Sequence, residues 1–301
     1  MSEAVVDDIV AVLPPLLQSL EALGFIARHL NPPQFDAVME AAGTPDQALQ
    51  AVRPRLADWP DEFAHLRTPL ETASDAAIAA FEGLRAVQHG NGDLIAVFRA
   101  LRHAPRAQEA LYPLTAKLPP VSNFFIDPPL REDADLLARL AEPGQENTGI
   151  MHHDNEPGSR GGFSLYVPEY YTPDRAWPLV MALHGGSGNG RSFLWSWLRD
   201  ARSYGAILIA PTATGSTWAL MGGDTDTPNL ARILATNKDL LKGDLWFICD
   251  GPEDPTGRLT IKFGARGIQK LELTVFGPKR ALHSGHYHDF GIYSQLRQQP
   301  A

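Results

Sequence analysis

One stretch limits the fold of this chain more than any other. Residues 177–190 read WPLVMALHGGSGNG, so an apolar run ends in a glycine-rich turn. A short continuous apolar run that is bounded by turn residues is typical of a strand buried on both faces. Glycines at the end of such a strand let the backbone approach a bound group closely, because no Cβ intervenes. The stretch therefore predicts a core strand of an α/β sheet with a backbone-lined site at its end.

The neighbouring residues alternate between strand and helix patterns. We expect strands at 163–167, 179–183 and 206–210, and helices at 192–203 and 228–235. Strands that alternate with helices are typical of a parallel sheet. The predicted fold class is α/β, with a partial parallel sheet that is preceded by an all-helical amino-terminal region.

Residues 1–140 form that helical region, because leucines recur at roughly helical spacing and alanine is abundant. Prolines such as Pro14, Pro15 and Pro69 predict that the region is divided into short helices. The clearest of these runs from Ser74 to Val87, with Ser74 as the expected N-cap. Residues 141–160 are polar and contain Gly and Pro, so they are predicted to be a linker.

Composition excludes several classes of partner and compartment. The 301 residues carry 35 acidic and 26 basic side chains, a net charge of −9, which argues against nucleic acid and anionic membranes as partners. The one cysteine, Cys249, excludes an intrachain disulfide and fits a cytoplasmic location. The amino terminus carries acids where a signal peptide needs basic residues, and we expect neither a targeting segment nor a membrane span.

Residues 161–236, with HGGSG after the apolar run, resemble the amino-terminal half of α/β-hydrolase esterases of the phospholipase/carboxylesterase group. The helical region resembles the leader of some bacterial members. The resemblance implies that Gly185 and Gly186 supply the backbone N–H groups of an oxyanion hole, and that the substrate is a small-molecule ester. It also requires a nucleophile in the pattern G-x-S-x-G. No serine of this chain lies in that pattern, and Ser187 fails it because Asn189 stands where the second glycine is needed.

Residues 238–287 contain ICDGP, FGARG and VFGPKRALHSGHY, and this segment resembles carnosinase-like di-zinc exopeptidases. The resemblance implies that Asp250 binds a metal, that His283 is a lid histidine which stabilises a developing oxyanion, and that the substrate is a peptide. Zinc is expected only under this interpretation, and otherwise no cofactor is expected. Residues 152–157 imitate the His-x-Asp motif that such a site needs, but no Glu-Glu pair precedes Asp250. Residues 288–301 are a polar tail.

Three functional interpretations follow. The first is a hydrolase-derived acyl hydrolase of esterase or phospholipase type, catalytically incomplete because its nucleophile is absent. The second is a di-zinc exopeptidase fragment, and the third is a non-catalytic chimera of gene fragments. The longer resemblance favours the first for ancestry, whereas the missing G-x-S-x-G motif favours the third for chemistry. The oligomeric state is open under all three.

Overall fold

The computed structural model describes residues 3–90, 93–142, 144–218 and 225–236. The chain divides into two compact units, Met1–Trp246 and Phe247–Ala301, and the second lies wholly outside the described residues. The segments 238–287 and 288–301 therefore also lie outside them, as do Asp250 and His283.

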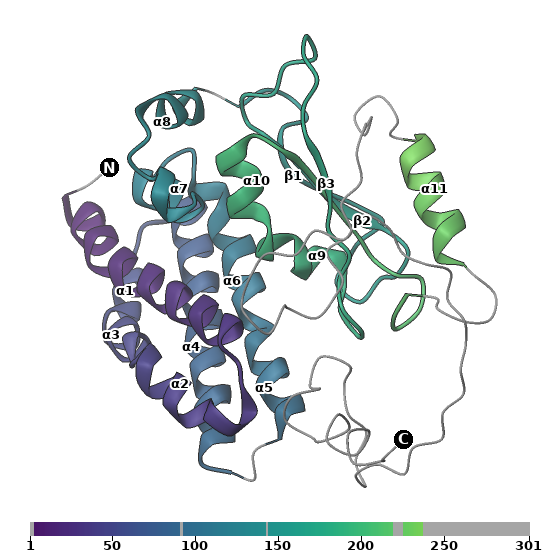
Figure 1. Ribbon diagram of the computed structural model, residues 1–301. Coiled ribbons are helices and arrows are strands. Elements are labelled where there is room, and N and C mark those ends of the chain that lie inside the picture. Colours follow the sequence, from purple (N-terminus) through teal and green to yellow (C-terminus); the bar gives the residue numbers. More distant parts are fainter. Residues whose placement is uncertain (1–2, 91–92, 143, 219–224, 237–301) are drawn as a thin grey trace, which may run out of the picture. The chain divides into compact units, whose positions relative to one another are not determined.

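The described chain begins with a helical layer, as the sequence predicts (Figure 1). All but the last of its helices contribute to one apolar core, and short loops and 3₁₀ turns join them. They are α1 (Glu3–Arg28), α2 (Phe35–Ala42), α3 (Pro45–Val52), α4 (Ala64–Gln88), α5 (Leu94–Leu101), α6 (His103–Leu111), α7 (Pro119–Phe124) and α8 (Ala134–Ala141).

The prediction that prolines divide this region into short helices is wrong for its two longest helices. α1 runs through Pro14 and Pro15, and α4 runs through Pro69. An interior proline costs about 3 kcal/mol because it removes one helical hydrogen bond and crowds the preceding turn. Burial on both sides offsets this cost, since each fully buried leucine, such as Leu16 or Leu70, contributes about 1.5–3 kcal/mol. Ser74 lies inside α4 rather than at its start, so its predicted capping role is also wrong.

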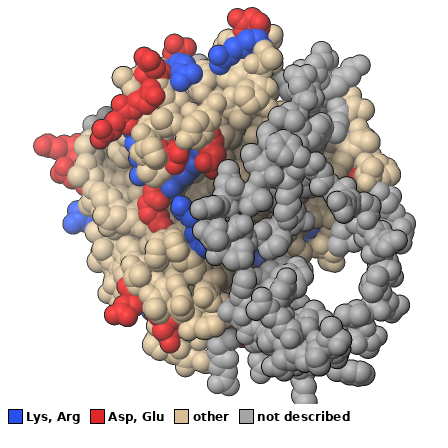
Figure 2. Space-filling model, viewed as in Figure 1, with Lys and Arg blue, Asp and Glu red and all other residues tan. Residues whose placement is uncertain are grey.

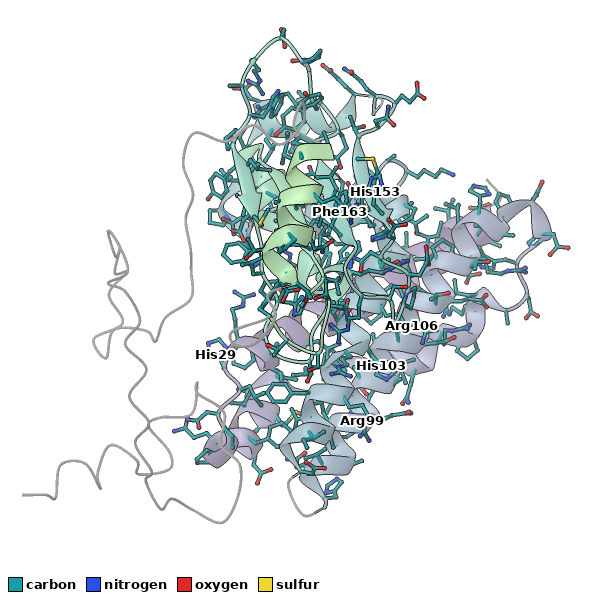
Figure 3. The ribbon with its side chains drawn as sticks, turned by 90° about the vertical axis from the view of Figure 1, so that its right-hand side faces the viewer. His29, Arg99, His103, Arg106, His153 and Phe163 are labelled. Carbon is teal, nitrogen blue, oxygen red and sulfur yellow. The ribbon has the colours of Figure 1, made fainter. Side chains whose placement is uncertain are left out.

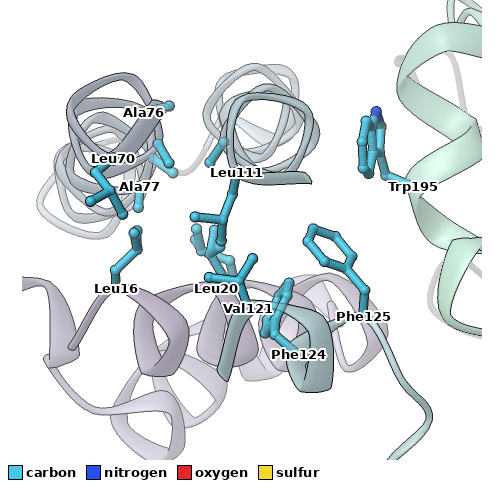
Figure 4. Packing of buried hydrophobic residues seen from close by; sticks show 14 of the residues in the cluster. Leu16, Leu20, Leu70, Ala76, Ala77, Leu111, Val121, Phe124, Phe125 and Trp195 are labelled. Atoms are coloured by element: carbon cyan, nitrogen blue, oxygen red, sulfur yellow. The ribbon is translucent and has the colours of Figure 1, made fainter. Parts of the chain in front are cut away.

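The helical core extends without a break into the α/β part of the chain. Leu16 and Leu20 of α1 pack in the same cluster as Leu70 of α4 (Figure 4). Phe125 and Trp195 belong to that cluster too, with ring centroids 6.0 Å apart. Because Trp195 lies between two strands of the sheet in sequence and the strand residue Leu208 belongs to the same cluster, the helical layer and the sheet share one core instead of forming separate domains.

By length and composition alone, α1 could cross a membrane, since its most apolar window has a mean hydropathy of 1.7. No other helix of the described ranges passes this test. Half of that window is buried inside the protein, and Leu16, Leu20 and Leu23 lie in the helical core. A core helix of a soluble protein has the same properties, so α1 is weak evidence for a span.

The sheet contains β1 (Gly149–His153), β2 (Phe163–Val167), β3 (Leu179–Met181) and β4 (Ile207–Pro211), in the spatial order β1-β2-β4-β3. The predicted parallel sheet is in fact mixed. The β3–β4 pair is parallel, whereas β1–β2 and β2–β4 are antiparallel. The reason lies in the connections: a parallel pair needs a long crossover, and among the described strands only β3 and β4 are joined through helices.

Helices cover both faces of the sheet, which explains why β2 and β4 are buried along their whole length. α9 (Gly190–Phe193) and α10 (Leu198–Tyr204) lie between the sheet and the helical layer (Figure 1). α11 (Asp226–Thr236) packs on the opposite face, where Ile233 contacts the cluster that contains Leu165 and Ile209. Alternate residues of each strand therefore face different cores.

The prediction of a linker at 141–160 is wrong for residues 149–153, which form β1. Residues 149–153 pair with β2 from Gly149↔Val167 to His153↔Phe163. β1 is an edge strand of the described sheet, and its sequence GIMHH, which ends in two histidines, is only partly buried. Because it lacks the continuous apolar run of a central strand, its pattern does not distinguish it from a loop.

Candidate functional site

The glycine-rich turn lies where the sequence places it, between the end of β3 and the start of α9. The N–H of Ala182 still donates to Ile209 O at 2.8 Å, which prolongs the pairing with β4 by one residue. The chain then leaves the sheet and closes a turn in which Gly188 N donates to Gly185 O at 3.1 Å. Ser187 occupies the third position of this turn with φ at 59°, a left-handed conformation that glycine or asparagine usually adopts there.

His184 holds the turn in place through hydrogen bonds. Its ring is buried, and Nε2 accepts a hydrogen bond from Ala213 N–H at 3.0 Å. Nδ1 therefore carries the proton, and it donates to Gly185 O at 2.7 Å. Trp218 completes the anchor by donating its indole N–H to His184 O at 2.7 Å. Since both ring nitrogens are engaged, His184 is a positioning residue and not a general base.

The pKa of the His184 ring is lowered from 6.5 because burial disfavours its charged form. Below about pH 6.5 the unfolded chain gains a proton that the folded protein does not take up, so stability falls with decreasing pH until the folded pKa is reached. Each unit by which the pKa is lowered contributes about 1.4 kcal/mol to this loss. His152 contributes in the same direction, because burial also lowers its pKa.

We predict that replacing His184 with glutamine reduces this loss of stability between pH 6.5 and 5. Urea unfolding of the wild type and the variant across that range measures the difference. NMR titration of the histidine rings provides the independent readout. A His184 ring that titrates at or above pH 6.5 would contradict the prediction.

Two consecutive backbone N–H groups of the turn are available to a ligand. Within the described residues, the N–H groups of Gly185 and Gly186 have no hydrogen-bond partner. Both glycines are exposed. A Cβ built at Gly185 would meet no atom within 4 Å, so the space above it is open. The N–H of Ser187, by contrast, donates to Ser216 O at 2.7 Å. Gly185 and Gly186 thus present donors of the kind that stabilise a carbonyl oxygen or an anion.

Ser187 has no base to activate it within the described residues. Its hydroxyl forms no hydrogen bond there, and the neighbouring His184 ring has already used both nitrogens. A serine becomes a nucleophile only when an adjacent group takes its proton. Within the described residues, the turn therefore offers binding donors without an activated nucleophile.

A Ser–His–Glu arrangement does occur nearby, but it is structural. Ser164 Oγ lies 2.7 Å from His152 Nδ1, and His152 Nε2 lies 3.7 Å from Glu109 Oε1. The Ser164 side chain is inaccessible to solvent and also accepts a hydrogen bond from Asn155 Nδ2 at 2.8 Å. No substrate carbonyl reaches a fully buried hydroxyl. Arg191 binds the same Glu109 carboxylate, which fixes the acid in a salt bridge.

This buried network continues to the far end of the glycine-rich turn. Thr212 Oγ1 donates to Asn155 Oδ1 at 2.8 Å and accepts from Gly190 N–H at 2.9 Å. Sequence reasoning missed the network, and interpreted residues 152–157 as an imitation of a metal motif. Only the polar residues within apolar strands, such as Ser164, could have indicated it.

The di-zinc interpretation finds no ligand set in the part of the chain that the structure describes. No three His, Cys, Asp or Glu side chains lie close enough there to hold a metal. His153 stacks on Phe163 instead, with ring centroids 4.7 Å apart and planes 16° from parallel (Figure 3).

The fold and the turn together define a mixed helix–sheet protein with an exposed pair of backbone donors after its third strand. No protein-family model, curated protein or solved structure matches this chain.

Proposed function

We propose that residues 1–236 are the amino-terminal part of an α/β-hydrolase-like protein, and that Gly185 and Gly186 bind the carbonyl oxygen of a small ester. One observation carries this proposal: two uncommitted N–H groups lie on consecutive residues directly after β3. In α/β-hydrolases the loop between the third strand and the next helix supplies an N–H group to the oxyanion hole. The position of the turn in this chain, between β3 and α9, supports the proposal.

In this proposal the turn binds an acyl group without hydrolysing it. Stabilisation of a developing oxyanion accelerates acyl transfer only when a nucleophile attacks the carbonyl carbon. Among the described residues Ser187 lacks a base, and Ser164 is buried. These observations favour a non-catalytic descendant of an acyl hydrolase. The exopeptidase alternative rests on Asp250 and His283, and none of the described residues adds support for it.

We predict that the full chain neither hydrolyses p-nitrophenyl butyrate above the background rate nor reacts stoichiometrically with a fluorophosphonate probe. The physical reason is the absence of an activated serine in the described chain. Labelling followed by mass spectrometry of the intact protein measures the stoichiometry, with Ser187→Ala as the control. Labelling of one serine that disappears in Ser187→Ala, together with loss of turnover, would overturn the prediction.

Binding is tested separately with ethyl butyrate, followed through the backbone amide signals of Gly185 and Gly186 in NMR spectra. Gly186→Pro removes one donor at the second position of the turn, where proline is well tolerated. It should abolish the binding shifts. Ser187→Ala is the matched control, because it alters the same turn and keeps the N–H groups of Gly185 and Gly186. Equal shifts of the Gly185 amide signal in the wild type and in Gly186→Pro would refute the carbonyl-binding role.

A further inference from the structure

Two arginines reach the glycine-rich turn from different elements. Arg102, at the carboxyl end of α5, donates from Nη2 to Ser187 O at 3.4 Å. Arg160, in the loop between β1 and β2, donates from Nη1 to Gly188 O at 2.7 Å. The two guanidinium groups thus contact consecutive carbonyl oxygens, and two like charges are brought to one small region.

Among the described residues, no carboxylate lies within ion-pair distance of these two guanidinium groups. Neither Arg102 nor Arg160 forms an ion pair within those residues. The acids on the same elements are mostly engaged elsewhere: Glu109 and Glu156 both bind Arg191. Asp154, in the same loop as Arg160, is exposed and forms no ion pair with either arginine. The positive charge beside the turn is therefore available to a ligand.

A row of further basic side chains continues from the turn along α5 and α6. Figure 3 shows Arg99, His103 and Arg106 one after another along these helices. Arg99 and Arg106 are exposed, and neither is ion-paired within the described residues. On the face seen in Figure 2, by contrast, acidic and basic groups lie side by side. In a chain of net charge −9, this concentration of unpaired arginines produces a local positive potential that attracts anions.

We propose that Arg102 and Arg160 hold the phosphate monoester group of a small-molecule ligand at the edge of the glycine-rich turn. Each guanidinium uses one nitrogen on a carbonyl and keeps other N–H donors for the ligand. A phosphate monoester carries about two negative charges and three acceptor oxygens, which match two guanidinium groups better than a carboxylate does. Arg99 and Arg106 steer the ligand without contacting it.

The inference deepens the proposed function, because a phosphate at this edge leaves the rest of the ligand beside Gly185 and Gly186. The proposed ligand class is then an ester that also carries a phosphate monoester. The ester part of this ligand class rests on the proposed function, whereas the phosphate part does not. Phosphate binding by the arginines requires no carbonyl site and is measurable alone.

The test is titration calorimetry of the full chain with inorganic phosphate at low ionic strength. The expected result is one site per chain, with a Kd that rises about tenfold in Arg102→Gln and in Arg160→Gln, because each variant loses a charge-assisted hydrogen bond. Lys117→Gln removes an exposed charge elsewhere and should leave the Kd unchanged. Absence of binding, or the same Kd in both arginine variants as in the wild type, would overturn the proposal.

Two further arms separate the alternatives. Gly186→Pro should keep its phosphate affinity while it loses the ester shifts. If phosphate binds normally and no ester shifts occur even in the wild type, the carbonyl-binding function fails and the phosphate site stands.

Co-sedimentation with phosphatidylcholine vesicles that contain phosphatidic acid, reversed by inorganic phosphate, would support the site and assign the phosphate to a lipid headgroup. Phosphate binding without co-sedimentation would support it with a soluble ligand. If Arg160→Gln fails to fold, Arg102→Gln alone decides the outcome.

Discussion

Replacing Glu169 with glutamine is expected to lower the free energy of unfolding by about 3 kcal/mol or more, the usual cost of breaking a buried ion pair. Glu169 lies after β2 and binds Arg202 of α10, with 2.9 Å between Oε1 and Nε. The Arg202 side chain is only 1% exposed, so the variant leaves its charge buried without a counterion. Burial acts to lower the pKa of Arg202, but the interactions with Glu169, Tyr112 and Tyr166 together outweigh burial and raise it.

The carboxylate also accepts hydrogen bonds from two phenols, that of the half-buried Tyr112 and that of the buried Tyr166. Tyr112 donates to Oε1 and Tyr166 to Oε2, each at 2.8 Å. Burial, and next the Glu169 charge, raise the pKa of both tyrosines, so their hydroxyl protons are retained for donation. A glutamine amide presents an NH₂ group to one of these donors, which leaves donor facing donor. The same cluster joins the helical layer to the sheet, because Arg202 also donates to Ser122 Oγ of α7 at 2.9 Å.

Urea unfolding monitored by circular dichroism measures this loss for Glu169→Gln. The matched control is Asp61→Asn, which breaks the ion pair with Arg67 at the surface. Exposed ion pairs contribute little, so the control should unfold close to the wild type. If the two variants have equal stability, the cluster around Glu169 does not hold the helical layer against the sheet.

The central strands could be predicted from the sequence because their apolar runs are short and continuous. The expected strand at 163–167 coincides with β2, and those at 179–183 and 206–210 overlap β3 and β4. β1 and the mixed strand directions were missed for a common reason. An edge strand such as GIMHH needs no apolar run, and strand direction depends on partners that no local pattern contains.

The candidate site, too, could be predicted from the sequence only in part. The glycine-rich turn is visible in the sequence because its residues are adjacent. The groups that hold it are not, since Arg102 is 85 positions from Ser187, and Ala213 is 29 positions from His184. Contacts of this kind are set by how the helical layer packs against the sheet. The predicted roles of Asp250 and His283 lie outside the described residues and stay predictions.

The glycines of the turn are not equivalent, and we expect Gly190→Ala to destabilise the protein by about 3 kcal/mol or more. A Cβ at Gly190 would lie 2.0 Å from Ala210 O and 2.7 Å from Pro211 O. Overpacking usually costs about 1–3 kcal/mol, and here the obstructing atoms belong to the backbone of β4, which cannot rotate away as a side chain can. The start of α9 must therefore move away from the sheet or the strand must shift.

The matched variant is Gly185→Ala, whose Cβ meets no atom within 4 Å and should leave the free energy of unfolding nearly unchanged. Helix propensity alone would make Gly190→Ala more stable than the wild type, because Gly190 begins α9 and alanine favours a helix over glycine by about 1 kcal/mol. A net loss in Gly190→Ala therefore has to come from the clash. Urea unfolding of both variants measures the difference. Gly190→Ala as stable as Gly185→Ala would mean that α9 does not begin against the end of β4, and the turn that carries the proposed site would have to be placed differently.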